Sequence, residues 1–129
     1  MALQILFGRD VVGMELNETE KKAIEIKKII MEVMGDRIDD PEIYDVVNVI
    51  PHCQFEIRFV AYDYFPVVFN YEQGIIGCSI KCGEKRWISL VKGQHWYSGT
   101  DFYAYFSEAK KELELRIPDK YLIAKGWKV

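Results

Sequence analysis

The chain contains few of the residues on which most catalytic and metal sites depend. Its 129 residues include two histidines, His52 and His95, and three cysteines, Cys53, Cys78 and Cys82. An odd number of cysteines in a chain without an export signal argues against a disulfide framework, so we expect reduced and mostly buried thiols. The sequence has no phosphate-binding loop, dinucleotide fingerprint, serine nucleophile elbow or HExxH segment. We therefore predict a protein that is not an enzyme and needs no cofactor.

The sequence also lacks a surplus of Lys and Arg residues and lacks long apolar runs. The formal net charge is -3, whereas a general nucleic-acid binder needs an excess of Lys and Arg to displace counterions from phosphate. The apolar run Met1 to Phe7 is short and is followed by Gly8-Arg9-Asp10, so it does not read as a leader peptide. No other stretch approaches the length that spans a bilayer. These absences predict a cytoplasmic protein that binds neither nucleic acid nor membrane.

What the chain does have is contact surface, in the form of seven Phe, eight Tyr and three Trp residues. The length fits one domain, residues 1–129, that can bury a sizeable core. No repeat or low-complexity linker divides the sequence. The excess of aromatic side chains over histidines favours a binding protein.

Apolar spacing predicts one long helix in the first third of the chain. Asn17 followed by Glu20 has capping-box character, an apolar stripe recurs from Ala23 onward, and Gly35 supplies a stop. We predict a helix over residues 18–34. The run Leu3 to Phe7 before it is compatible with an edge strand or with a simple apolar anchor.

Residues 41–50 are ambiguous between helix and strand. Asp40-Pro41 is a good N-cap and first-turn pair, and the apolar spacing that follows fits a helix, although the segment is rich in strand formers. We favour a short helix here. From Cys53 the period changes to two, which predicts a half-buried strand, and residues 67–71, 75–82 and 86–91 are predicted as three more strands joined by short turns.

A second long helix is predicted after Ser98 or Thr100, either of which can cap it, and Pro118 ends it. A short helix or turn over residues 119–124 follows. The predicted class is α+β: a single domain with a four-stranded antiparallel meander and two long helices packed on one face.

The histidines and cysteines are the candidates for a metal site or a thiol nucleophile. His52-Cys53, Cys78-x-x-x-Cys82 and His95 offer zinc ligands, but structural zinc sites use tighter paired spacing. Cys78 and Cys82 share a strand face with an isoleucine, which is typical of packing. His52 and Cys53 would point to opposite faces of a strand, so their adjacency in sequence argues against contact, and His95 would meet Cys78 or Cys82 only if the fold brought them together. We expect no metal site.

Two groups of residues are candidates for a partner-binding surface. Residues 36–45 carry five carboxylates against one arginine, and such charge steers a basic partner, although capping and solvation of a helix entrance would explain it equally well. Several Tyr, Trp and Phe side chains fall at predicted turns, where aromatic residues often anchor interfaces. The candidate set is Asp36, Asp39, Asp40, Glu42, Asp45, Tyr62, Tyr64, Phe65, Trp96 and Tyr97.

The segment Arg116-Ile117-Pro118-Asp119-Lys120-Tyr121-Leu122-Ile123-Ala124-Lys125-Gly126-Trp127, after a polar-faced helix, resembles the tail of small bacterial immunity proteins encoded beside polymorphic or contact-dependent toxins. The resemblance covers about a quarter of the chain, with support from its size and element order. It implies a cytoplasmic protein that binds one cognate toxin, often a basic nuclease domain, and blocks its active site or substrate path. It transfers no contact residues, and it leaves the oligomeric state open.

Two other classes remain as alternatives. The first is a small-ligand-binding α+β module whose meander and helices enclose an apolar pocket. The second is a cysteine- or metal-dependent enzyme, which zinc analysis and thiol reactivity of the purified protein would test.

Overall fold

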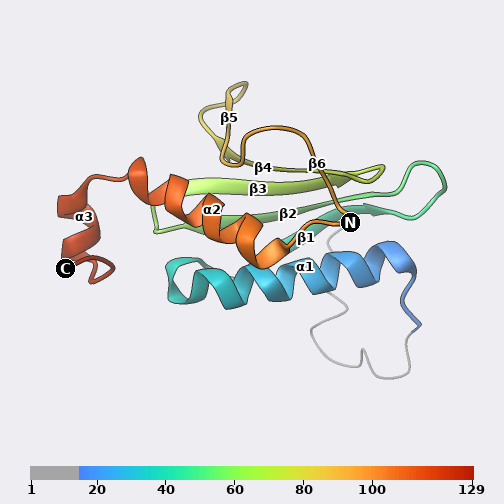
Figure 1. Cartoon of the computed structure of the whole chain (residues 1–129), viewed down its shortest axis with the longest axis horizontal. Coiled ribbons are helices and arrows are strands. Elements are labelled where there is room, and N and C mark those ends of the chain that lie inside the picture. Colours follow the sequence, from blue (N-terminus) through green and yellow to red (C-terminus); the bar gives the residue numbers. More distant parts are fainter. Residues whose placement is uncertain (1–14) are drawn as a thin grey trace.

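The protein is built on an antiparallel sheet with helices along one side (Figure 1). The computed structural model describes residues 15–129, so the apolar run Leu3 to Phe7 lies outside the described residues. The strands run in the order β1 (Glu42–Val47), β2 (Gln54–Ala61), β3 (Phe65–Glu72), β4 (Ile75–Lys81) and β5 (Trp87–Ser89), and β6 (His95–Trp96) pairs with β4. The α+β class and the antiparallel meander are confirmed. The predicted count of four strands is wrong, because the described residues form six.

Helix α1 (Glu18–Met34) has the predicted bounds. Its first turn closes by a capping box, in which the Glu20 backbone N–H donates to Asn17 Oδ1 at 2.7 Å and the Asn17 N–H donates to Glu20 Oε1 at 2.9 Å. Gly35 ends the helix with a φ of +59°, a conformation that side chains disfavour. A single 3-10 turn, η2 (Gly35–Arg37), leads on toward the sheet.

The helix predicted for residues 41–50 is wrong, because this segment contains strand β1. Ile43 lies opposite Ile57 of β2, and both side chains are fully buried. The strand formers of the segment therefore outweigh the Asp40-Pro41 pair once a neighbouring strand is available. The register shifts between Tyr44 and Val47, and Asp45 within this irregular stretch has a φ of +55°.

Helix α2 (Phe102–Leu115) follows the sheet, but neither Ser98 nor Thr100 caps it. The N-cap is Asp101, whose carboxylate accepts hydrogen bonds from the N–H groups of Tyr103 and Ala104 at 3.1 and 3.2 Å. The Thr100 hydroxyl instead donates to the Trp96 carbonyl. Helix α3 (Asp119–Ala124) has the predicted bounds and begins directly after Pro118.

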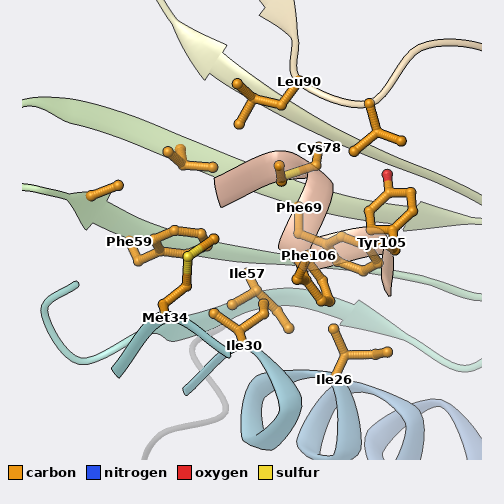
Figure 2. Packing of buried hydrophobic residues seen from close by; sticks show 14 of the residues in the cluster. Ile26, Ile30, Met34, Ile57, Phe59, Phe69, Cys78, Leu90, Tyr105 and Phe106 are labelled. Atoms are coloured by element: carbon orange, nitrogen blue, oxygen red, sulfur yellow. The ribbon is translucent and has the colours of Figure 1, made fainter. Parts of the chain in front are cut away.

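The core lies between the inner face of the sheet and helices α1 and α2. Figure 2 shows Ile26, Ile30 and Met34 of α1 pointing toward Ile57, Phe59 and Phe69 of the sheet, with Phe106 and Tyr105 of α2 beside them. Phe69 is fully buried, and its ring centroid lies 5.4 Å from that of Phe106. The strands therefore bury alternate side chains on the inner face and present the others on the outer face.

Candidate functional site

The outer face of the sheet is uncovered among residues 15–129. No described helix packs on it, and the alternate side chains of β2, β3 and β4 that point to it are half-buried or exposed. The face is hollowed, with a volume of about 660 Å³. Five carboxylates and two basic side chains line the hollow, a formal balance of -3: Asp39, Asp40, Glu42, Glu56, Glu72, Arg58 and Lys81.

Three of the predicted acidic residues lie together at the β1 side of this hollow. Asp40 is within 3.6 Å of Lys27 Nζ, while the Asp39 Oδ1 atom accepts a hydrogen bond from the Val60 N–H at 2.7 Å. Glu42 accepts a hydrogen bond from the Tyr44 hydroxyl. Each carboxylate therefore has a structural contact, and each still lines the hollow.

The two other predicted acidic residues take different places. Asp36 lies in the 3-10 turn after α1, 3.4 Å from the guanidinium of Arg37, and does not line the hollow. Asp45 lies in the irregular part of β1, where its Oδ2 atom is 3.8 Å from Arg58. Four of the five acidic candidates thus gather at the β1 side of the sheet.

A cluster around Arg58 occupies the centre of the acidic side. The Arg58 guanidinium lies 4.5 Å from the centroid of the Tyr44 ring, within the range of a cation–π contact. Its Nη2 and Nε atoms lie 2.9 and 3.1 Å from Glu56 Oε1. The hydrogen bond to the Glu42 carboxylate raises the pKa of Tyr44, with its partial burial adding to the shift, and the hydroxyl therefore stays a donor.

Apolar side chains form part of the floor and of the far rim of the hollow, beside the polar side chains of Gln54, Asn70 and Ser79. Val60, Pro66 and Val68 lie across β2 and β3. Trp87 of β5 is half exposed at the far rim, and Lys81 lies 5.7 Å from the centroid of its ring. The outer face therefore combines an acidic side with an apolar and aromatic side, as protein interfaces commonly do.

The predicted aromatic candidates do not share this face, apart from Trp96. The expectation that Tyr62 is a surface residue is wrong, because its side chain is fully buried and its hydroxyl donates to Glu114. Burial is the main cause that raises the pKa of Tyr62 above its usual value. Its ring also packs edge-on against Trp127 at 5.1 Å. The C-terminal segment covers a turn that sequence alone places at the surface.

The remaining aromatic candidates lie at opposite ends of the sheet. Tyr64 is partly exposed and packs against Phe65 and Tyr121 at 4.7 and 5.0 Å between ring centroids. Tyr97 is half-buried against the core. Trp96 is 52% exposed and pairs with Ile75 of β4, which places both on the outer face beyond the hollow.

Sequence reasoning missed Glu56, Arg58, Tyr44 and Trp87 as candidate contacts. The signal for the first two was present, because the period of two in β2 places Glu56 and Arg58 together on the polar face. Tyr44 lies beside them only because residues 42–47 form strand β1, and the helix predicted for residues 41–50 does not place it there.

The cysteines and histidines show no catalytic arrangement in the described part of the chain. Complete burial raises the pKa of the Cys78 thiol to about 12, which leaves it protonated and unreactive. The His95 Nε2 atom donates to the Lys92 carbonyl at 2.8 Å, and His52 Nδ1 lies 3.1 Å from the Gln73 amide. Within residues 15–129, no group of three or more His, Cys, Asp or Glu side chains is placed to hold a metal ion.

Comparisons with known proteins found no matching family model, no similar curated protein and no similar solved structure. Among the residues described, no helix combines the length and the apolar character needed to cross a bilayer.

Proposed function

We propose that this chain is an inhibitor of the immunity type, which binds a basic toxin domain through the outer face of its sheet and blocks the active site or substrate path of that domain. A nuclease is the leading candidate for the toxin, because a surface that attracts phosphate is basic. The protein would act in the cytoplasm, by occlusion and without catalysis.

One observation carries this proposal: an uncovered, hollowed sheet face with five carboxylates and two basic side chains. A surface of this charge attracts a basic partner over several ångströms and raises the association rate. The apolar floor at Val60, Pro66 and Val68 supplies area that excludes water once the partner is bound. Trp87 at the rim is the kind of large, rigid side chain on which binding energy concentrates.

The small-ligand alternative has no comparable support. It requires an apolar pocket between the helices and the sheet, where one continuous cluster of buried side chains lies. The 660 Å³ hollow is on the outer side and is lined by charged and polar groups as well as apolar ones.

The direct test is co-expression with the product of a toxin gene found beside the gene for this chain, followed by copurification of the two chains. We expect protection from the toxin and a stable complex. Absence of both protection and affinity would refute the proposal.

Charge reversal then tests the docking face. The double substitution Asp40→Lys and Glu42→Lys is expected to lower the association rate about 10-fold or more at low salt, with a smaller effect at high salt. The double substitution Glu25→Lys and Glu108→Lys is the matched control, because these carboxylates are exposed on α1 and α2, in the layer on the other side of the sheet. An unchanged rate for the double variant, or an equal loss in the control, would exclude the outer face.

A further inference from the structure

The contacts around Arg58 form a binding arrangement for a guanidinium group. Glu42 lies directly opposite Arg58, and Tyr44 lies directly opposite Glu56, so these four side chains make a two-by-two block on β1 and β2. The Tyr44 ring stacks on the guanidinium, while Glu56 and Asp45 lie at its edge. Glu42 holds the Tyr44 hydroxyl. We call Glu42, Tyr44, Asp45 and Glu56 the arginine cage.

The cage carries more negative charge than Arg58 neutralises. It has three carboxylates, of which Asp45 and Glu56 contact the single guanidinium, and this leaves a formal charge of -2 on the outer face. The Arg58 side chain is 49% exposed, and the Asp45 side chain is 53% exposed. Ion pairs at such exposure contribute little to folding, so the pairing of Arg58 can be exchanged at small cost. Arg58 also lines the hollow that the proposed partner would occupy.

We propose that the cage is the point at which the outer face recognises its partner, and that it receives an arginine side chain of that partner in place of Arg58. This inference rests on the proposed function, which supplies a basic protein as the occupant. The arriving guanidinium takes over the stacking on Tyr44 and the contacts to Glu56 and Asp45. Arg58, an exposed side chain on a long flexible stem, turns out toward solvent.

The chemistry of the cage selects arginine over lysine. A guanidinium is planar, stacks on an aromatic ring and presents several N–H donors in one plane. An ammonium is a compact and strongly hydrated charge, which gains less from a ring at half exposure. An arginine-bearing segment of a basic protein is therefore the expected occupant, and a lysine-rich segment of the same charge is a poorer one.

Two peptides test this inference without any toxin. They have the same length and charge, and one carries Lys at every position where the other carries Arg. In the Arg58→Gln variant the cage is vacated, so we expect the Arg peptide to bind about 3- to 10-fold more tightly than it binds the unaltered protein at low salt. The Lys peptide is expected to gain less than about 2-fold from the same change.

Lys81→Gln, made together with Trp87→Leu, is the matched control, because it removes one positive charge from the same hollow outside the cage and leaves no vacated ring there. It should improve binding of both peptides equally. In the Arg58→Gln background, Tyr44→Ala should abolish the preference for the Arg peptide, whereas Tyr44→Phe should keep it because the ring remains. Circular dichroism establishes that each variant is folded, and Tyr44→Phe decides the role of the ring if Tyr44→Ala does not fold.

The inference is overturned if Arg58→Gln favours both peptides equally, or if it resembles the control with Lys81→Gln and Trp87→Leu. Its failure and that of the proposed function are separable. A toxin that binds without any arginine preference in the peptides would refute the cage alone. A clear preference in the peptides without toxin binding would refute the immunity function alone.

Discussion

Phe69 and Val68 are neighbours on β3, yet four aromatic rings surround the first and an open hollow borders the second. The same alternation runs through β2 and β4, so each strand contributes to two surfaces of different character. The inner surface consists mainly of buried apolar groups packed against α1 and α2. On the outer surface, charged side chains such as Arg58, Asp45 and Glu56 are partly exposed and lie within 4 Å of one another's charged atoms along the pairs that Arg58 makes. Substitutions on the two faces should therefore change different properties of the protein.

The largest expected difference is in stability. Phe69→Ala removes a fully buried ring and leaves a cavity between sheet and helices, so we expect a loss of about 3 to 5 kcal/mol in the free energy of unfolding. Val68→Ala, one residue away on the outer face, should cost less than about 1 kcal/mol. Urea denaturation of both variants measures these losses. Equal losses would mean that the two faces are not energetically distinct.

Thiol reactivity should differ between Cys78 on the covered face of the sheet and Cys82 after the end of β4. Because burial raises the pKa of Cys78 to about 12, the thiolate fraction at pH 8 is roughly one in ten thousand. Cys82, just past the end of the same strand, is only half-buried and serves as the internal reference. We expect iodoacetamide to modify Cys78 at least about 100-fold more slowly than Cys82 in the native protein. Peptide mass spectrometry gives both rates, and similar rates would show that β4 opens readily.

Removal of two tyrosine hydroxyls, one on each side of the sheet, should give a smaller difference in stability. Tyr62 donates to Glu114 on the covered side, and Tyr44 donates to Glu42 on the open side. Tyr62→Phe should cost about 1 kcal/mol, because the fully buried tyrosine loses its hydrogen bond to the partly exposed Glu114 carboxylate. Tyr44→Phe should change stability by less than about 0.5 kcal/mol. Thermal unfolding of the two variants compares them, and a larger loss for Tyr44→Phe would reverse our assignment of the two environments.

The parts of the fold that local sequence determines were predictable. The capping box at Asn17 and the stop at Gly35 depend on a few neighbouring residues, and they place both ends of α1. Alternation over Phe55, Ile57 and Phe59 likewise identifies β2.

The features that depend on distant partners were not predictable in the same way. Strand β1 forms because Ile43 meets Ile57 across the sheet, a contact that the local Asp40-Pro41 signal does not contain. Tyr62 is buried because Trp127, far away in the sequence, packs on it. The acidic side of the hollow was predicted as a group of charges, but its central contacts needed β1 and β2 to be placed side by side.

The irregularity at Asp45 has a consequence for the behaviour of many copies of the chain in solution. Within residues 15–129, β1 is paired only to β2, so its other edge is a place where a strand from another copy could add. The positive φ of Asp45 and the register shift between Tyr44 and Val47 interrupt the regular row of hydrogen-bonding groups that such a strand would need. Glu42 and Asp45 on two identical edges would also repel each other. The strand that helps to form the arginine cage is thereby a poor template for aggregation, which favours a protein that stays dispersed at high concentration.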